Sequence, residues 1–234
     1  DVMACRQTGF AMLCEGNVQE VMDLSPVAHL AAISGKVPFI NFFDGFRTSH
    51  EIQKIAVWDY DDLKEMCDMD AVQAFRDHAL NPEHPHMRGS HENGDVFFQH
   101  REACNKFYDE LPAIVEKYMA MINEKLGTNY QLFNYYGAED ADRVIIAMGS
   151  ICDVAEEVID YLNAHGEKVG LVKVRLYRPF RADKLIAAIP STCKSIAVLD
   201  RTKEPGALGE PLYLDVVTAL AENGKTGLKV IGGR

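Results

Sequence analysis

The hydrophobic pattern of residues 9–45 predicts a strand, a helix and a second strand. A short apolar segment leads into a polar Gly-Asn turn. Apolar residues then recur at the spacing of one helical face until Gly35, which we expect to cap the helix at its carboxyl end. The run VPFINFF that follows has no alternation, which is typical of a parallel strand buried on both faces. Two parallel strands joined by a helix are the unit of a doubly wound sheet.

The pattern changes over residues 50–130. Helical segments interrupted by acidic residues precede a loop rich in Pro, Gly and Asn at residues 81–95, and a helical pattern then runs from residue 96 to Gly127. Loops of this length are uncommon in compact domains. We therefore expect the loop to serve a function or to pack along another surface.

A second series of alternating strands and helices begins near Asn129. Strands are expected at residues 142–150, 168–180, 194–202 and 228–233, and helices at 151–166, 182–190 and 212–224. Such alternation predicts a small parallel sheet with helices on both faces. The chain is thus predicted to be an α/β protein with two parts, residues 1–128 and 129–234.

Composition narrows the class of protein. Apolar residues make up 47% of the chain and charged residues 25%, the balance of a soluble globular protein. The net charge of −11 argues against nucleic-acid binding, which needs clustered Lys and Arg. The six cysteines form no CxxC pair, so we expect neither a zinc knuckle nor an iron–sulfur cluster in this chain, but reduced thiols in a cytoplasmic protein. No apolar run approaches the roughly 20 residues that span a bilayer.

The stretch FFDGFRTSHE at residues 42–51 concentrates candidate chemistry at the end of a predicted strand, where α/β enzymes gather function. Asp44 is suited to orient a base or to accept a hydrogen bond from a helix N-terminus, and Arg47 to clamp a carboxylate or phosphate. Thr48 or Ser49 resembles the cap of a helix that would continue through EIQKIAVW, with His50 beside it. A structural reading, with a turn, a helix cap and a salt bridge, explains the same residues.

Four other segments have a functional and a structural interpretation. His84, His86 and His91 have a spacing that can bind a metal, but a solvated or interface loop also accounts for them. Ser150 and Asp153 could form an anion-binding helix N-terminus or a simple N-cap. The loop 201–211 could contact a neighbouring domain or a substrate, and the basic run 173–181 could meet a phosphate or form a domain seam. The sequence contains no dinucleotide glycine fingerprint, Walker loop, Ser-His-Asp order or GDG-type thiamine motif.

Several longer blocks, in the same order along the whole chain, resemble pyruvate:ferredoxin (flavodoxin) oxidoreductases. They are RQTGFAML, VPFINFFDGFRTSHEIQKI, NPEHPHMRG, VIIAMGS, GLVKVRLYRPF and VLDRTKEPGALGEPLYLDV. The chain starts at Asp1 without an initiator Met, which we interpret as a piece of a longer polypeptide. The resemblance implies that residues 1–128 are the C-terminal part of a pyrimidine-type thiamine diphosphate domain. It implies that residues 129–234 are most of a transketolase C-terminal-like domain.

The resemblance further implies a cytoplasmic homodimeric enzyme of anaerobic metabolism that converts pyruvate to acetyl-coenzyme A and carbon dioxide. Such an enzyme uses thiamine diphosphate with Mg²⁺ and passes electrons through [4Fe–4S] clusters to ferredoxin or flavodoxin. In the family, the pyruvate contacts and the carboxylate that activates thiamine lie upstream of this segment, and the coenzyme A contacts and cluster cysteines lie downstream. We therefore assign no catalytic, cofactor or metal residue here, and expect the segment alone to be inactive.

Asp44, Arg47, Thr48 and His50 are kept as candidates for the wall of the active site or the dimer seam. The alternative to an enzyme segment is a non-catalytic subunit or binding module of a split 2-oxoacid:ferredoxin oxidoreductase. A NAD-dependent dehydrogenase is disfavoured because the glycine fingerprint is missing.

Overall fold

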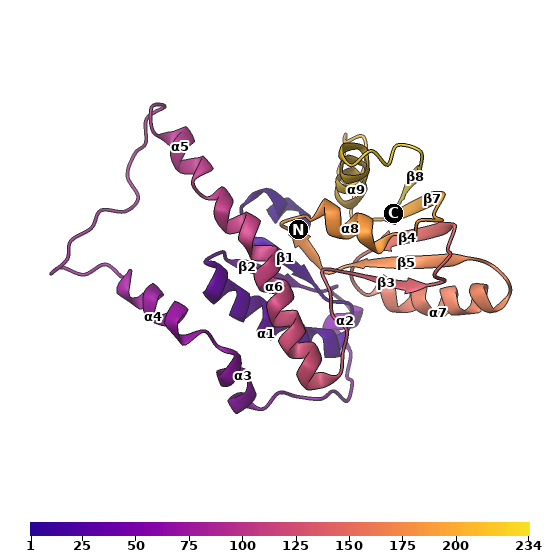
Figure 1. The fold of residues 1–234 in the computed structure, drawn as a ribbon, viewed down its shortest axis with the longest axis horizontal. Coiled ribbons are helices and arrows are strands. Elements are labelled where there is room, and N and C mark those ends of the chain that lie inside the picture. Colours follow the sequence, from indigo (N-terminus) through magenta and orange to yellow (C-terminus); the bar gives the residue numbers. More distant parts are fainter.

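The computed structural model describes the whole chain except the side chain of Arg47, and it contains two sheets (Figure 1). The smaller sheet has the order β2 (Phe39–Phe42), β1 (Ala11–Cys14), β6 (Leu176–Arg178). The larger sheet has the order β3 (Phe133–Gly137), β5 (Val169–Val174), β4 (Arg143–Ala147), β7 (Ser195–Leu199), β8 (Lys229–Gly233). The helices are η1 (Val2–Gln7), α1 (Val18–Gly35), α2 (Arg47–His50), α3 (Tyr60–Met66), α4 (Met69–Asp77), α5 (Phe97–Glu102), α6 (Asn105–Leu126), α7 (Ile151–Ala164), α8 (Ala182–Ala188) and α9 (Pro211–Glu222).

The first strand–helix–strand unit is confirmed, because β1 and β2 pair in parallel with α1 between them in sequence. The expectation that the second strand is buried on both faces is wrong. All four residues of β2 are only half-buried, whereas those of β1 are buried. The physical reason is position: β2 lies at the edge of its sheet, while β1 is central and pairs on its other side with β6.

Gly35 has a different role from the cap that the sequence suggested. It is the last residue of α1, and Lys36 is the left-handed C-cap, with φ of 58°. A Cβ atom at Gly35 would lie 2.5 Å from Cδ1 of Leu111 in α6. The missing side chain therefore allows α1 and α6 to pack closely, and both helices contribute to the main hydrophobic core.

The second sheet confirms the predicted parallel arrangement over four strands, β5, β4, β7 and β8. The strand β3, which pairs with β5 in antiparallel fashion, adds an edge that the pattern did not reveal. Helix α7 lies on one face of the sheet, and α8 and α9 lie on the other (Figure 1).

Three elements predicted from the sequence differ in the structure. The strand expected at 168–180 splits, and its two parts join different sheets as β5 and β6. The helix expected at 96–127 breaks between α5 and α6, although Gly127 does end it, with φ of 70°. The helix expected to continue through EIQKIAVW is wrong: α2 ends at His50, and no helix is assigned to residues 51–59.

Residues 51–59 are held against α1 instead of forming a helix of their own. The backbone N–H of Ala56 donates to Oε1 of Gln19 at 2.8 Å, and Nε1 of Trp58 donates to the backbone oxygen of Met22 at 3.2 Å. These partners in α1 replace some of the backbone bonds that a helix would supply.

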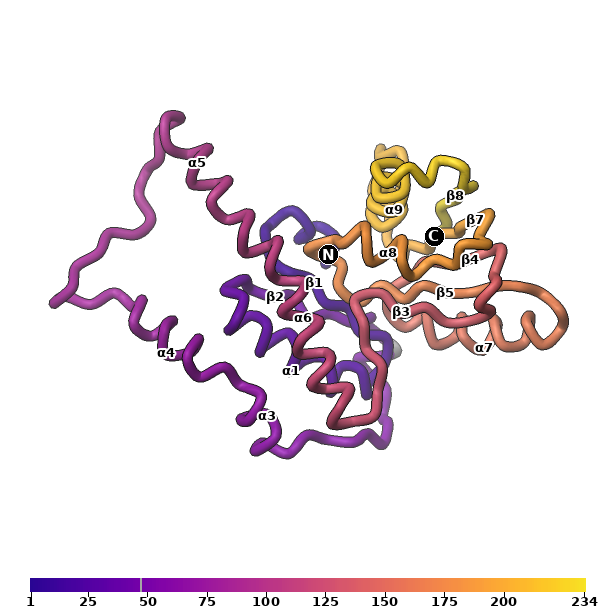
Figure 2. The backbone as a smooth tube through the Cα atoms, viewed as in Figure 1, coloured from indigo at the N-terminus to yellow at the C-terminus, as the bar shows by residue number. Residues whose placement is uncertain are grey.

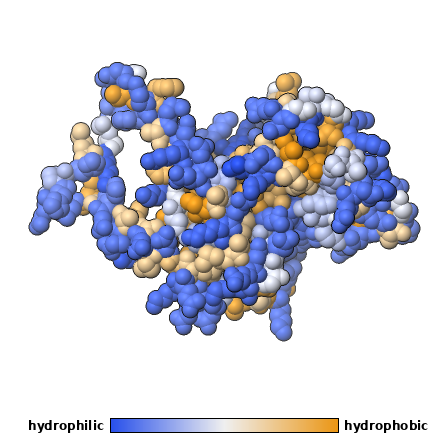
Figure 3. All heavy atoms as spheres, in the orientation of Figure 1, coloured by the Kyte–Doolittle hydropathy of each residue, from blue (hydrophilic) through white to orange (hydrophobic). Residues whose placement is uncertain are grey.

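Residues 60–104, with α3, α4 and α5, extend away from both sheets as an arm (Figures 1 and 2). Much of the arm is exposed, including large apolar side chains: Tyr60, Met69, Phe75, Leu80, Met87, Phe97 and Phe98. The face drawn in Figure 3 is mostly hydrophilic over the arm, with apolar spots among the charged groups. Among the helices described, none is both long and apolar enough to cross a membrane.

Candidate functional site at the carboxyl ends of the strands

Asp44 lies two residues beyond β2 and connects the two sheets. Its Oδ2 accepts a hydrogen bond from the backbone N–H of Ser150, at the start of α7, at 2.5 Å. Its Oδ1 pairs with Nη1 of Arg201, just beyond β7, at 3.0 Å. Of the two roles suggested for Asp44, the structure shows acceptance from a helix N-terminus. Ser150 occupies the predicted N-cap position of α7 and Asp153 lies in the first turn, although the Ser150 side chain makes no cap hydrogen bond.

Gly149 is required for this contact. Its φ of +84° lies in the left-handed region, and a Cβ atom there would stand 2.6 Å from Oδ2 of Asp44. The turn after β4 therefore needs glycine for two reasons, its backbone conformation and the approach of the carboxylate.

The turn that follows β1 also contacts the first turn of α7. Oδ1 of Asn17 accepts from the backbone N–H of Glu20 at 2.9 Å and caps α1, while its Nδ2 donates to Oδ2 of Asp153 in α7 at 2.9 Å. Asn17 thus joins the N-termini of α1 and α7, each of which carries a partial positive charge that Glu20 and Asp153 offset.

A cleft of about 710 Å³ lies among these strand ends. Its lining is part polar and part apolar, and the charged members are Asp44, Glu51, Asp153, Asp200, Arg201 and Arg234. Both arginines are engaged, Arg201 with Asp44 and Arg234 with Glu210 at 2.9 Å. The carboxylates also have structural partners, so the cleft is built mainly from helix caps and ion pairs.

Asp200 is another carboxylate that caps a helix. It is buried just after β7 and accepts from the backbone N–H groups of Leu212 and Tyr213 at 2.9 and 3.0 Å, which caps α9. Burial raises the pKa of Asp200 above its ordinary value, and the two hydrogen bonds oppose this shift.

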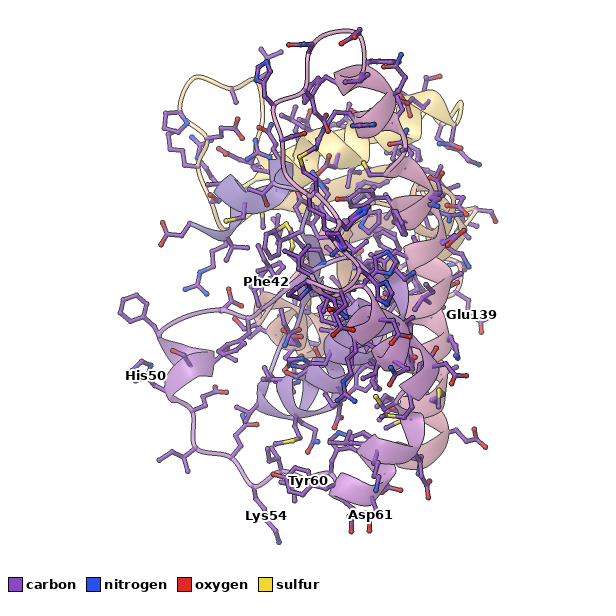
Figure 4. All side chains as sticks on the ribbon, turned by 90° about the vertical axis from the view of Figure 1, so that its left-hand side faces the viewer. Phe42, His50, Lys54, Tyr60, Asp61 and Glu139 are labelled. Carbon is purple, nitrogen blue, oxygen red and sulfur yellow. The ribbon has the colours of Figure 1, made fainter. Side chains whose placement is uncertain are left out.

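The structure separates the candidates of FFDGFRTSHE. Asp44 and the buried Thr48 both line the cleft. His50 lies on the outer surface, where it projects from the short helix α2 (Figure 4), and its Nδ1 is 2.8 Å from Oγ of Ser49. The side chain of Arg47 lies outside the described residues.

A buried ionic network beneath the cleft was not predicted from the sequence. Nη1 and Nη2 of Arg175 donate to the two carboxylate oxygens of Glu20 at 2.7 and 2.9 Å, and Nε donates to Oδ1 of Asn134 at 2.8 Å. Burial alone would raise the pKa of Glu20, but the hydrogen bonds and charge of Arg175 hold it below its ordinary value. The basic run 173–181 therefore forms a seam between the sheets, one of its two predicted roles.

Glu15, directly after β1, is a second residue that sequence reasoning missed. Its side chain is fully buried, and neither carboxylate oxygen has a hydrogen-bond partner among the described residues. Burial, followed by the negative charge of Glu20, raises the pKa of Glu15 to about 9. The only sequence signal was an acidic residue at the end of an uninterrupted apolar strand.

The remaining predicted segments are placed on the surface or against other elements. His84, His86 and His91 are exposed, and the described part of the chain contains no group of three or more His, Cys, Asp or Glu side chains arranged to hold a metal ion. In the loop 201–211, Glu204 pairs with Arg6 of η1 at 2.7 Å, so this loop contacts the N-terminal segment. All six cysteines are free thiols.

Both halves of the chain match family models of one class of enzyme, the 2-oxoacid-type oxidoreductases that act with ferredoxin or flavodoxin. Residues 1–120 match the family described as pyruvate flavodoxin/ferredoxin oxidoreductase, thiamine diphosphate-binding, and residues 141–234 match pyruvate:ferredoxin oxidoreductase core domain II. The chain belongs to the pyruvate flavodoxin/ferredoxin oxidoreductase family. The resemblance seen in the sequence is thereby confirmed.

Individual proteins agree with the family models. The chain is 59% identical to the pyruvate:ferredoxin oxidoreductase of Moorella thermoacetica and 60% identical to the pyruvate-flavodoxin oxidoreductase of Klebsiella pneumoniae, in both cases over 234 residues. These alignments cover all of this chain but 20% of each relative, so the chain spans about a fifth of their length. A solved 2-oxoglutarate:ferredoxin oxidoreductase from Magnetococcus marinus matches with a TM-score of 0.52 and 17% identity, covering 95% of this chain and 38% of that one. This last likeness supports the α/β fold.

The family description raises the question of whether these residues fit thiamine diphosphate. A diphosphate with its cation needs free cationic or amide donors and a set of oxygen ligands. In the cleft, Arg201 and Arg234 are paired, the amide of Ser150 donates to Asp44, and none of the described carboxylates gather into a metal-binding group. The described residues alone do not fit the cofactor, and we assign none of them a role toward it.

Proposed function

We propose that this chain is part of a longer pyruvate:ferredoxin or pyruvate:flavodoxin oxidoreductase. The observation that carries the proposal is identity of about 60% along all 234 residues with relatives that bear these names. In the proposed enzyme, residues 1–128 belong to the pyrimidine-type thiamine diphosphate domain and residues 129–234 to the transketolase C-terminal-like domain. The remaining polypeptide supplies the cofactor ligands.

The proposed reaction is the oxidative decarboxylation of pyruvate to acetyl-coenzyme A and carbon dioxide. Thiamine diphosphate with Mg²⁺ would supply the carbanion chemistry, and [4Fe–4S] clusters would pass the electrons to ferredoxin or flavodoxin. We propose that the enzyme is a cytoplasmic homodimer. The family description names thiamine diphosphate, which supports the cofactor.

Within this enzyme we propose that the chain works as a junction that fixes two domains relative to each other. The contacts of Asp44 with Ser150 and Arg201, and of Arg175 with Glu20, support this role. Asp44, Arg47, Thr48 and His50 remain proposed residues of the site wall or the dimer seam. Arg47→Ala should lower activity or dimer content, and wild-type values of both would remove Arg47 from the proposal.

The test is an assay of the purified full-length protein. Pyruvate should reduce ferredoxin or flavodoxin only when coenzyme A is present, with release of carbon dioxide, and 2-oxoglutarate serves as the control substrate. Reduction with 2-oxoglutarate and not with pyruvate would contradict the proposed substrate. A native polypeptide of about this chain's length would instead favour the alternative, a non-catalytic subunit or binding module of a split 2-oxoacid:ferredoxin oxidoreductase.

A further inference from the structure

One face of the five-stranded sheet is only partly covered. Helix α7 contacts β5 and β3 on this face, while α8 and α9 cover the opposite face (Figure 1). Five strands about 4.8 Å apart are roughly 19 Å across, and one helix about 10 Å wide covers about half of that. The part of this face over β7 and β8 is the least covered, because β4 still packs against α7 through the buried Ala147, whereas Ile231 in β8 is 54% exposed.

The strand register shows how the exposure of apolar side chains changes across this face of the sheet. Leu171, Ile145, Ala197 and Ile231 are paired in one row from β5 to β8. Leu171, beneath α7, is fully buried, Ile145 and Ala197 are half-buried, and Ile231 is 54% exposed. Exposure therefore rises with distance from α7.

The side chains on the two faces of β7 show the same difference in exposure within one strand. Ile196 and Val198, which face the side covered by α9, are 1% and 0% exposed. Ala197 and Leu199, which face the other side, are apolar but only half-buried. Alternation places these pairs on opposite faces, so the difference reflects the missing cover and not the strand itself.

Helix α7 carries more apolar surface than one sheet contact requires. Cys152, Ala155 and Ile159 are buried against the sheet. A second stripe beside them stays exposed: Ile151 43%, Val154 59%, Val158 50% and Tyr161 63%. At 100° per residue the two stripes together cover about 180° of the helix, compared with roughly 100° for a helix that packs on one layer.

The exposed stripe and the open half-sheet enclose one apolar groove. The groove has a volume of about 430 Å³, with Ile151, Val154 and Val158 on its α7 side and Ile145, Ala197, Leu199 and Ile231 on its sheet side. A helix laid in it would contact α7 laterally and the sheet below, which is the arrangement of α/β layers.

We propose that this groove holds an amphipathic α-helix from the part of the longer polypeptide that lies outside these 234 residues. The inference rests on the proposed function in one respect, that the chain belongs to a longer polypeptide. About four fifths of the length of the relatives is available to supply the helix. In such a polypeptide the residues following Arg234 start beside the groove, because β8 forms its far side.

Photo-crosslinking in the full-length protein tests the proposal. A benzophenone amino acid replaces Val158 in the groove or, as a matched control, the exposed Ala164 on the solvent side of α7. The expected result is a crosslink from position 158 at the mass of one polypeptide, joined to a peptide outside residues 1–234, with none from position 164. A crosslink at the mass of two polypeptides, or equal yields at both positions, would overturn the proposal.

A carboxylate introduced into the groove provides a second test of the proposal. In the full-length protein, Val154→Asp should raise the rate of protease cleavage within residues 143–234 by roughly tenfold, because it buries an unpaired carboxylate. Ala164→Asp, on the same helix, should leave the rate unchanged. Equal rates for the two variants would contradict burial of the groove, and the crosslink remains decisive if Val154→Asp does not fold. Pyruvate oxidation by the unmodified protein is measured separately, so failure of the proposed function is distinguished from failure of the groove proposal.

Discussion

The carboxylate of Asp44 caps α7 through a hydrogen bond from the backbone N–H of Ser150, the N-cap residue, which lies 106 residues later in the chain. The same carboxylate pairs with Arg201, so the FFDG turn holds two corners of the second sheet at once. The most conspicuous polar motif in the sequence thus has a defined structural task.

Replacing Asp44 should weaken the start of α7 locally. Asp44→Ala removes the cap of α7 and the ion pair with Arg201. We expect it to lower the free energy of local unfolding of the first turn of α7 by about 1–2 kcal/mol. Asp44→Asn keeps an acceptor for the Ser150 N–H and should lose less. Hydrogen exchange of residues 149–153 in the full-length protein measures the effect, and equal exchange in Asp44→Ala and wild type would refute the capping role.

Gly149→Ala should be more disruptive than an alanine at another left-handed glycine. Gly149 and Gly166 both have positive φ, +84° and +90°, but only Gly149 has the carboxylate of Asp44 within 2.6 Å of the added Cβ, whereas Gly166 faces open space. Both variants carry backbone strain of about 1 kcal/mol. The excess loss in Gly149→Ala, compared by thermal unfolding, reports the clash, and it should shrink in the double variant with Asp44→Ala.

Glu15 should make the protein less stable as pH rises. Its pKa is about 9 in the folded chain compared with an ordinary 4.5, so between these values the folded state keeps a proton that the unfolded state releases. Stability from this group is then complete below about pH 4.5 and falls as pH rises toward 9, by on the order of 3 kcal/mol between pH 4.5 and pH 7 at 1.36 kcal/mol per unit.

Glu15→Gln removes this dependence, because glutamine stays neutral at every pH. We expect the variant to become more stable than wild type as pH rises from about 5 to 8, when hydrogen exchange of β1 is compared at each pH. Glu139→Gln, at an exposed position, is the control and should show no such trend. A constant difference between Glu15→Gln and wild type across this range would show that Glu15 does not titrate as stated.

The Arg175–Glu20 pair should show strong coupling. Removing one partner, as in Glu20→Gln or Arg175→Met, leaves a buried charge without its counter-ion and should cost about 3–5 kcal/mol. The double variant should lose less than the sum of the two, as a double-mutant cycle by chemical unfolding would show. The exposed pair Lys168–Asp140 is the comparison and should couple by less than about 1 kcal/mol.

The sequence by itself determined the family and most of the strands and helices. Short apolar runs and helical spacing, with turn residues between them, located β1, α1, β4, α7, β7 and α9, because these elements are long or strongly apolar. It also determined that Asp44 stands at a strand end, since the apolar run before it is unambiguous.

Only the tertiary structure decided which segments meet. The split of residues 168–180 between two sheets, the edge position of β2, the use of Gly35 to admit Leu111 and the pairing of Arg175 with Glu20 all depend on partners far away in the chain. Local spacing reports which face of an element is apolar, but not what covers that face. For the same reason the sequence showed α7 as an ordinary amphipathic helix, and only the packed sheet revealed that half of its apolar surface still lacks a partner among the described residues.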